Sequence, residues 1–584
     1  MRSLSKVYLI LFLIIFMLFS LTTSFVFAEK MVETPRNETL YINGLIWGAP
    51  ANFNYLSGSA AAFPCAEPGV GRILVYETLF MFNQLTGDLE PLVGESYEWT
   101  DPYTLKVKLN KAAHWSDGTP LTAEDVAYSY KLGEKYSIPW SSFLLYLKDV
   151  KAESPSVVVL ELNKEKYNKL SILDSLATVP LHPKHIWSEI EKEAGYDMAE
   201  IRKFFNEDPV GSGPYKIMYY DDTKVIVIRD DNYWGKALFG KLPAPKYITH
   251  PIFKDNAAGN LAFKNGEIDV SQQFIPNVWK MWEDGTPIKC YLDDFPYYIP
   301  GSIPSIFFNL SKKGLDVFEV RKAIAMCIDY KKIAEVAMTG YSANIEPGFT
   351  LLTEAESKYI DKDAVKPYQW TTDVDGANEL LDSIGAEKGK DGIRVLKDGT
   401  RLGPYEIECP YGWTDWNASL EIVMQNAKKI GIEMRTKFPE APVALNDAYI
   451  GKFDIDMMWS SSSSMSQPWL RAKDFLGSEG VAPIGEIAFS NYNRFKNDRA
   501  DEIINLIPQK EDFKELKELY TELAIIYLKN IPFVGLMYRP WEFYTVNETV
   551  WEGFPTATDG KNIPPQICMD GAGIRALYEI KAKQ

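Results

Sequence analysis

Short runs of β-branched and aromatic residues, bounded by turn residues, predict β-strands along most of the chain. Such residues are favoured in extended backbone because their side chains fit the pleated surface of a sheet. The predicted strands are residues 40–47, 105–109, 157–162, 215–220, 225–229, 432–436 and 453–459. No internal repeat of the length found in solenoids or propellers accompanies them, so a repeat architecture is not expected.

Four segments place apolar residues at the 3.6-residue spacing of helices that bury one face. The predicted helices cover about residues 122–132, 316–327, 416–430 and 513–529. The first opens with the capping-box sequence Thr122-Ala-Glu-Asp125 and is expected to end at Gly133, and Asp316-Val-Phe-Glu319 opens the second in the same way. The third is expected to end at Gly431 and leads at once into the strand at 432–436. This mixture of helices and strands indicates the α/β fold class.

The first 28 residues have the pattern of a secretory signal peptide. Arg2 and Lys6 precede and flank the start of an apolar run at 7–19, and Val26-Phe27-Ala28 provides a small-residue cleavage site. An uncleaved anchor is the alternative, because about 20 residues are enough to span a bilayer. We expect cleavage after Ala28 and secretion of the chain to the periplasm or the exterior of the cell envelope.

Length, charge and cysteine content narrow the class of protein. A chain of 584 residues is longer than one hydrophobic core usually organises, so several domains are expected. The formal net charge of −17 disfavours a polyanionic partner, and nucleic acid is not expected to bind. The five cysteines are too widely spaced for a zinc knuckle and too few for a disulfide framework, and their pairing stays open.

Residues that usually carry enzymatic chemistry are sparse. The chain has four histidines, and the pair in His182-Pro-Lys-His185 has no third metal ligand nearby. No Gly-x-Ser-x-Gly elbow marks a serine hydrolase, and Leu242 stands where a phosphate loop at 235–241 would need Ser or Thr. A secreted glycosidase stays an alternative, because its two carboxylates need only a suitable separation in space. We expect a non-enzymatic protein without metal or cofactor.

Aromatic side chains at predicted strand ends are the strongest candidates for ligand binding. Phe, Trp and Tyr make up 13% of the chain, and several of the 15 tryptophans lie among Asn, Ser, Gln and Asp. Such sites suit a sugar, because a ring can cover its C–H face while amides and hydroxyls pair with its hydroxyl groups. Each ring has the alternative of a core position. The candidates for stacking are Trp47, Trp413, Trp416, Trp459, Trp469, Tyr538 and Trp541, and those for hydrogen bonding are Asn52, Ser461 and Gln467.

A series of motifs resembles those of the extracellular solute-binding proteins of family 5, which serve importers of dipeptides, oligopeptides, nickel and oligosaccharides. The motifs follow one another in the order found in that family, and they span nearly all of the chain after the predicted signal peptide. They include Val75-Tyr-Glu-Thr-Leu79, His114-Trp-Ser-Asp-Gly-Thr-Pro-Leu-Thr-Ala-Glu-Asp-Val126, Gly211-Ser-Gly-Pro-Tyr215 and Ala262-Phe-Lys-Asn-Gly-Glu-Ile-Asp269, with later matches at 306–309, 320–323, 430–432 and 516–532.

This resemblance implies a type II periplasmic-binding-protein fold, in which two α/β lobes close by a hinge motion on a ligand held between them. It also implies a monomeric receptor that is recognised by the membrane permease subunits of an ABC importer. The expected organisation is a signal peptide at 1–28, lobe I at 29–56, 211–300 and 545–584, a subdomain inserted in lobe I at 57–210, and lobe II at 301–544.

The sequence departs from the peptide-binding members of the family after the strand at 453–459. In those relatives an aspartate that pairs with the α-amino group of the peptide follows within a few residues, whereas here Ser460-Ser-Ser-Ser-Ser-Met-Ser-Gln467 contains no carboxylate. Asp415 is the candidate for a replacement. We therefore expect a short β-linked oligosaccharide, such as cellobiose, mannobiose or a laminari-oligosaccharide, and keep an oligopeptide as the alternative. Nickel is disfavoured because imidazole and soft ligands are few.

Overall fold

The computed structural model describes residues 32–65, 73–459, 464–540, 543–565 and 570–583. The chain divides into two compact units, Met1–Arg36 and Asn37–Gln584, and every strand belongs to the second. Residues 1–28 lie outside the described ranges, so the signal peptide stays a prediction. No helix within the described ranges is long and apolar enough to cross a membrane.

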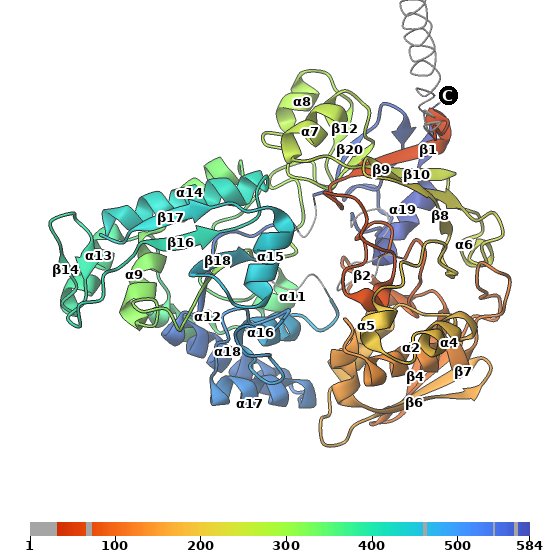
Figure 1. Cartoon of the computed structure of the whole chain (residues 1–584), viewed down its shortest axis with the longest axis horizontal. Helices are drawn as coiled ribbons and strands as arrows, with labels where there is room; N and C mark the ends of the chain where they lie inside the picture. The colour runs from red at the N-terminus through yellow and green to blue at the C-terminus, as the bar shows by residue number, and fades with distance from the viewer. Residues whose placement is uncertain (1–31, 66–72, 460–463, 541–542, 566–569, 584) are drawn as a thin grey trace, which may run out of the picture. The chain divides into compact units, whose positions relative to one another are not determined.

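A seven-stranded mixed sheet joins segments that lie far apart in the sequence (Figure 1). Its order is β12-β20-β11-β1-β10-β9-β8. The strands are β1 (Thr39–Asn43), β8 (Tyr215–Tyr220), β9 (Lys224–Arg229), β10 (Tyr247–Pro251), β11 (Val270–Ser271), β12 (Ile288–Lys289) and β20 (Thr545–Asn547). Strand β1 runs parallel to both β10 and β11. The three therefore end at the same edge of the sheet.

A five-stranded sheet has the order β17-β16-β18-β13-β19. Its strands are β13 (Ser305–Phe308), β16 (Tyr405–Glu408), β17 (Met434–Lys437), β18 (Ile455–Met458) and β19 (Phe533–Gly535). All residues of β13, β18 and β19 are buried, as expected for strands that are covered on both faces. The helix α14 (Thr414–Lys429) lies along β16 and β17 (Figure 1).

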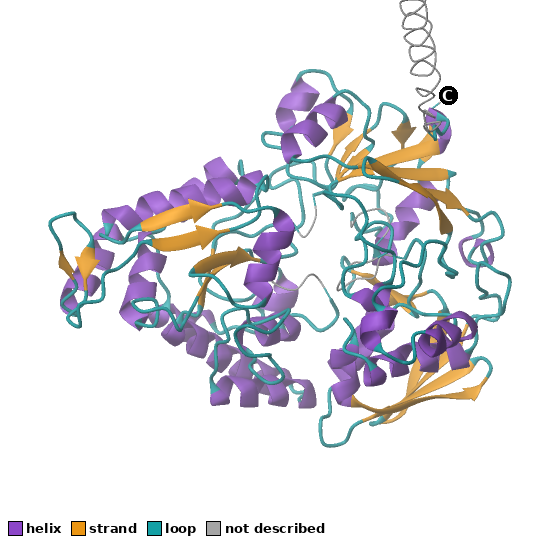
Figure 2. Ribbon diagram, in the orientation of Figure 1, coloured by secondary structure: helices purple, strands orange, loops and turns teal. Residues whose placement is uncertain are grey.

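A third, antiparallel sheet of four strands lies within residues 57–210, which we call the inserted segment. Its order is β4-β5-β7-β6, with β4 (Gly94–Asp101), β5 (Thr104–Leu109), β6 (Leu147–Ser154) and β7 (Val157–Leu162). Helix α2 (Ala123–Lys135) contacts β6 and β7, and Figure 2 shows helices gathered beside these strands. The outer strand β4 is largely exposed.

The remaining helices and paired strands complete the fold. The paired strands are β2 (Phe80–Asn83) with β3 (Asp88–Pro91), β14 (Glu387–Lys388) with β15 (Arg394–Val395), and β21 (Trp551–Glu552) with β22 (Lys581–Ala582). The other helices are α3 (Lys169–Thr178), α4 (Lys184–Glu193), α5 (Met198–Ile201), α6 (Lys236–Phe239), α7 (Asn256–Lys264), α8 (Trp279–Glu283), α9 (Phe318–Cys327), α10 (Tyr330–Lys332), α11 (Glu354–Ser357), α12 (Lys362–Val365), α13 (Val374–Ser383), α15 (Ala441–Tyr449), α16 (Trp469–Leu476), α17 (Asp498–Leu506), α18 (Phe513–Asn530) and α19 (Ala576–Glu579).

Most predicted strands are confirmed, with corrections at their ends. The strand predicted at 40–47 ends at Asn43, because Gly44 adopts a positive φ of 91°, and a Cβ at this position would lie 2.8 Å from the backbone N of Gln273. Trp47 therefore lies beyond the strand, in the loop that follows it. The predicted strands at 432–436 and 453–459 are shorter and cover 434–437 and 455–458.

The predicted helices are all present. The residues predicted to begin or end them are confirmed in some cases and wrong in others. The capping box of α2 is confirmed, since the backbone N–H of Thr122 donates to the Asp125 carboxylate at 2.8 Å. Gly133 does not end this helix, which continues to Lys135, and Gly133 instead gives room to Leu144. Asp316 does not begin α9 either, because its carboxylate accepts from the N–H of Gly314 at 2.8 Å.

The three sheets draw their strands from different segments of the chain. Strands of the seven-stranded sheet come from 39–43, 215–289 and 545–547, all within the ranges expected for lobe I. Strands of the five-stranded sheet lie within 301–544. The boundaries of the lobes themselves stay a prediction.

Two glycines of the segment Gly211-Ser-Gly-Pro-Tyr215 allow it to lie directly against another stretch of backbone. The N–H of Gly213 donates to Val75 O at 2.9 Å, and the N–H of Tyr215 donates to Leu74 O at 2.9 Å. A Cβ on Gly213 would lie 2.3 Å from Leu74 O. The segment joins the inserted segment to β8, so its close packing fixes where the two meet.

We predict that Gly213→Ala lowers the free energy of unfolding by about 1–3 kcal/mol, because the added methyl group must push two backbones apart. Urea unfolding followed by circular dichroism measures the effect. Gly48→Ala is the matched control, since its Cβ would meet nothing within 4 Å and its φ is not positive. Equal losses in the two variants would contradict the packing argument.

Candidate ligand-binding site

The candidate site lies at one edge of the five-stranded sheet, where three strands end together. Strands β16 and β18 are parallel, and β13 runs antiparallel to both β18 and β19. Strands β16, β18 and β19 therefore share one direction. The chain leaves this edge toward Trp413, Trp459 and Arg539. Ligands of open α/β sheets bind outside the carboxyl ends of the strands.

Three tryptophan rings from two of these strand ends form a cluster. The ring centroids of Trp413 and Trp416 are 4.9 Å apart at 81°, and those of Trp413 and Trp459 are 5.6 Å apart at 32°. The centroids of Trp416 and Trp459 are 5.9 Å apart. Trp416 is buried, whereas Trp413 and Trp459 are partly exposed. The buried ring thus supports two rings that present part of their surface.

Asp415 lies in the first turn of α14 and is neutralised by a cation from the third strand end. Its side chain is 1% exposed, and its Oδ2 accepts from Arg539 Nε at 2.7 Å. The guanidinium of Arg539 also lies 4.5 Å from the centroid of the Phe543 ring. The N-terminal turn of a helix favours a carboxylate, and the ion pair compensates its burial. Asp415 is therefore not a free anion at this edge.

A second polar edge belongs to the seven-stranded sheet. Gln272 directly follows β11, its side chain is 1% exposed, and both atoms of its amide lack a hydrogen-bond partner among the described residues. The N–H of Phe543 donates to Gln272 O at 3.1 Å, so this residue lies next to the segment that carries Arg539. A buried amide without partners costs free energy unless a ligand or solvent satisfies it. Gln272 is thus a candidate ligand contact.

Sequence reasoning missed Arg539 and Gln272, although both carried a usable signal. Arg539 stands directly after Tyr538, one of the predicted stacking residues, and Gln272 directly follows a strand of the sheet. Polar residues in those positions lie at a sheet edge, in the same way as the selected tryptophans.

Other predicted residues lie in several local environments. Asn52 organises its own loop, because its Oδ1 accepts from the N–H of Asn54 and from Ser57 Oγ, both at 2.9 Å. Trp47 is half-buried in the loop after β1. Gln467 is half-buried, and its Oε1 accepts from the N–H of Arg471 at 3.2 Å in the first turn of α16. Their roles as ligand contacts stay predictions.

Trp469 and Tyr538 are almost completely enclosed. Trp469 is 2% exposed, and its Nε1 donates to Ile504 O at 2.8 Å, so its position favours a core role. Tyr538 is 3% exposed, and its hydroxyl accepts from the N–H of Glu346 at 3.4 Å. Burial raises the pKa of Tyr538. Ser461 and Trp541 lie outside the described residues.

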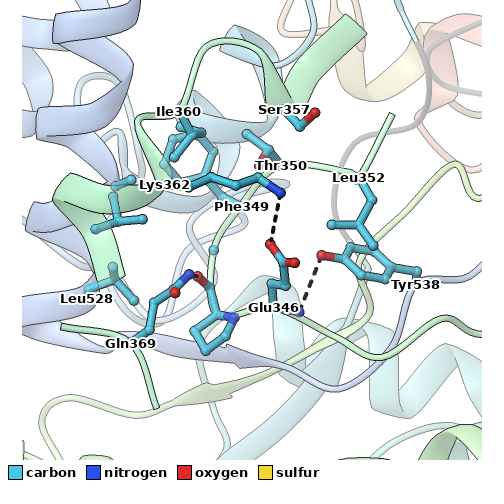
Figure 3. A pocket seen from close by; sticks show the side chains of 14 residues that line it. Glu346, Phe349, Thr350, Leu352, Ser357, Ile360, Lys362, Gln369, Leu528 and Tyr538 are labelled. Atoms are coloured by element: carbon cyan, nitrogen blue, oxygen red, sulfur yellow. Dashed lines mark hydrogen bonds and ion pairs between the residues drawn. The ribbon is translucent and has the colours of Figure 1, made fainter. Parts of the chain in front are cut away.

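Tyr538 lines a pocket together with Glu346 and Leu352 (Figure 3). Glu346 and Lys362 form an ion pair of 4.0 Å between their charged atoms there, and Phe349, Ile360 and Leu528 provide apolar walls. None of the cluster residues lines this pocket. The candidate site at the sheet edges therefore does not include this pocket.

The histidine pair noted in the sequence is divided between two environments. His182 is completely buried and stacks on Tyr76, and burial lowers the pKa of its imidazole to about 3. His185 is exposed, and its Nε2 lies 2.7 Å from Asp117 Oδ2. Within the described ranges, no group of three or more His, Cys, Asp and Glu side chains is placed to hold a metal ion.

We predict that Arg539→Met lowers the free energy of unfolding by about 3 kcal/mol, because it leaves the buried carboxylate of Asp415 without a cation. The double variant Asp415→Asn with Arg539→Met should recover part of the loss. Lys264→Met serves as the control, since its pair with Asp284 is exposed and is expected to contribute less than about 1 kcal/mol. Chemical unfolding measures all three variants, and a double variant as unstable as Arg539→Met contradicts the ion-pair argument.

Comparisons with known proteins identify the family of this chain. Residues 88–480 match the model of the bacterial extracellular solute-binding proteins, family 5 Middle. The peptidoglycan-binding protein YepA of Agrobacterium fabrum is 30% identical over 525 residues, which cover 82% of each chain.

Solved structures agree with this assignment. An oligopeptide ABC transporter periplasmic oligopeptide-binding protein from Thermotoga maritima, with bound mannohexaose, is 28% identical; the match has a TM-score of 0.85 and covers 94% of this chain and 100% of that one. AppA of Bacillus subtilis in complex with a nonapeptide shares the fold at 21% identity, with a TM-score of 0.75 and coverage of 94% and 99%. This chain therefore belongs to family 5 of the bacterial extracellular solute-binding proteins, the two-lobed α/β receptors that bind substrates for ABC importers.

Proposed function

We propose that this protein is the receptor that captures a short β-linked oligosaccharide and delivers it to the permease subunits of an ABC importer. The observation that carries the proposal is the pair of partly exposed rings, Trp413 and Trp459, at the carboxyl edge of the five-stranded sheet. Aromatic rings at such an edge suit the C–H faces of a sugar. The bound mannohexaose of the Thermotoga maritima relative supports the same ligand class.

The electrostatics of this edge also favour a sugar over a peptide. A peptide brings a positively charged α-amino group, which needs an accessible carboxylate when it is desolvated. Asp415 was the candidate for that role, but it is buried and paired with Arg539. The unpartnered amide of Gln272 offers a donor and an acceptor that match hydroxyl groups.

An oligopeptide is the second candidate ligand of the same receptor. The nonapeptide complex of AppA, whose likeness to this chain supports the shared fold, motivates this alternative. Under either ligand class we propose binding without turnover, by a monomer that acts outside the cytoplasmic membrane after loss of residues 1–28.

Two adjacent segments are suited to the hinge that such a receptor needs. The N–H of Gly301 donates to Arg539 O at 2.9 Å, and the N–H of Arg539 donates to Ser302 O at 3.1 Å. These bonds join the chain before β13 to the chain after β19 as a short ribbon. We propose that the lobes close by bending at this ribbon.

The ligand class is tested by isothermal titration of refolded, ligand-stripped protein. The panel contains cellobiose, mannobiose, laminaribiose, mannohexaose, a soluble peptidoglycan fragment and a pool of tri- to pentapeptides. We expect micromolar or tighter binding to at least one β-linked oligosaccharide, because the site offers aromatic surface and the carboxylate at the start of α14, Asp415, is paired with Arg539. Binding of peptides without any response to sugars overturns the sugar assignment and leaves the receptor function. Release of shorter sugars during prolonged incubation would instead support a glycosidase.

We predict that Trp413→Ala and Trp459→Ala each weaken binding of the oligosaccharide by about 1–3 kcal/mol, because a desolvated aromatic contact is lost. Trp282→Ala is the control, since this partly buried ring packs on Tyr297 and is not part of the cluster. Titration calorimetry gives the affinity and thermal unfolding gives the stability of each variant. An unchanged affinity with a lower unfolding temperature would place the ring in the core.

A further inference from the structure

Asp174 of the inserted segment forms a hydrogen bond with a turn at residues 464–467, which lies far from it in the sequence. It lies on α3, its side chain is 4% exposed, and its Oδ2 accepts from Ser466 Oγ at 2.7 Å. Ser466 is buried in turn, and its hydroxyl lies 2.9 Å from that of Ser464. One carboxylate thus anchors a pair of linked hydroxyl groups, 292 residues away in the sequence.

Further contacts join residues on both sides of Ser466 in the sequence to the inserted segment. Met465, between the two serines, packs on a small apolar cluster with Phe82 and Ala177. Further along, the ring of Trp469 meets that of Tyr146 at 6.3 Å. The rim carries an exposed ion pair, because Lys166 Nζ lies 2.9 Å from Glu479 Oε1. A buried hydrogen bond, apolar packing and exposed charges are the components of a specific interface.

The turn that Asp174 holds lies close in sequence to the candidate ligand site. It begins five positions after Trp459, whose partly exposed ring is in the tryptophan cluster, and it leads into α16. Its backbone is closed by the N–H of Gln467, which donates to Ser464 O at 3.3 Å. Gln467 is itself one of the predicted ligand contacts. The anchor on α3 therefore fixes the turn that carries Gln467 relative to the inserted segment.

We propose that Asp174 is a positioning residue of the ligand site, which holds the Ser464–Gln467 turn in its binding-competent place most firmly when its carboxyl group is protonated. The inference rests on the proposed function, because it assigns a regulation to the same site. It gives the inserted segment a role: the segment supplies a proton-dependent anchor for the turn.

The surroundings of Asp174 explain the dependence on protonation. Burial raises the pKa of Asp174 to about 6, although hydrogen bonds from Ser466 and Ser464 lower it; Asp474 raises it and Lys473 lowers it, both from α16. Of the other elements that contact α3, the turn at Ser141–Tyr146 contributes the phenol of Tyr146. Strand β2 and the turn at Ile507–Gln509 contain no ionisable side chain. Lys169 is the other ionisable residue of α3, and its ammonium lies over the ring of Trp99 and 3.9 Å from Glu511 Oε1.

The sign of the effect follows from the raised pKa. A carboxyl group that is easier to protonate in the held turn than in water stabilises that turn below about pH 4, and the stabilisation is lost as the pH rises through about 6. Affinity falls with the population of the binding-competent turn. Because each pKa unit corresponds to a tenfold change, the affinity for ligand can fall by up to about 100-fold between these limits.

We predict that the dissociation constant of the best-binding sugar in the panel rises between pH 4.5 and 7.5 for the wild-type protein, and that Asp174→Asn removes most of this dependence. Asn keeps the acceptor for Ser466 without a charge. Ser466→Ala should weaken binding at every pH, because the anchor is lost. Asp101→Asn, at an exposed carboxylate of the inserted segment, is the control and should keep the wild-type pH profile. Equal pH profiles for the wild-type protein and Asp174→Asn overturn the proposal.

A second measurement separates failure of this proposal from failure of the proposed function. If no sugar in the panel binds at any pH, the sugar-receptor proposal fails, and the unfolding temperature of the ligand-free protein decides the role of Asp174. Asp174→Asn should then match the wild-type protein at pH 4 and exceed it increasingly up to pH 7.5. A difference that does not change with pH would refute the proton-dependent anchor.

Discussion

The shared direction of β16, β18 and β19 is the constraint on which the candidate site depends. Three strands that end at one edge deliver three chain segments to the same place, although those segments begin at residues 409, 459 and 536. The tryptophan cluster and Arg539 are consequences of that arrangement. No local feature of any one segment would bring them together. The helix α14 starts at the same edge and places Asp415 in its first turn.

The Asp415–Arg539 pair decides the electrostatic character of this edge. A buried carboxylate alone would attract a ligand cation, such as the α-amino group of a peptide. Paired with Arg539, it serves instead to fix the segment after β19 against the start of α14. The same guanidinium covers Phe543, whose N–H reaches Gln272 of the seven-stranded sheet. One ion pair therefore links the aromatic cluster to the second polar edge.

The inserted segment gives the fold a connection beyond the ribbon at Ser302 and Arg539. Its four-stranded sheet is complete without the rest of the chain, yet α3 contributes the carboxylate that anchors Ser466. In family 5 the two lobes must move for ligand to enter and leave. An anchor built from one buried carboxyl group and two hydroxyls can be adjusted by a proton, because desolvation penalises only its charged form.

Features that depend on neighbours along the chain could be predicted from local sequence patterns. Three local predictions agree with the structure: the capping box at Thr122 and Asp125, the apolar face of α18 and the bounds of β7. The order of the motifs also indicated the family that the comparison confirms.

Which side chains are buried, and which distant residues pair, depends on the tertiary structure. Trp459 precedes a run of serines and Trp469 follows Gln467-Pro468, yet Trp459 is partly exposed in a cluster, whereas Trp469 is enclosed and its indole N–H donates to Ile504 O. Asp415 meets Arg539 across 124 residues. These outcomes depend on the order of strands in a sheet and on which segments it brings together, and that information is not contained in any short window of the chain.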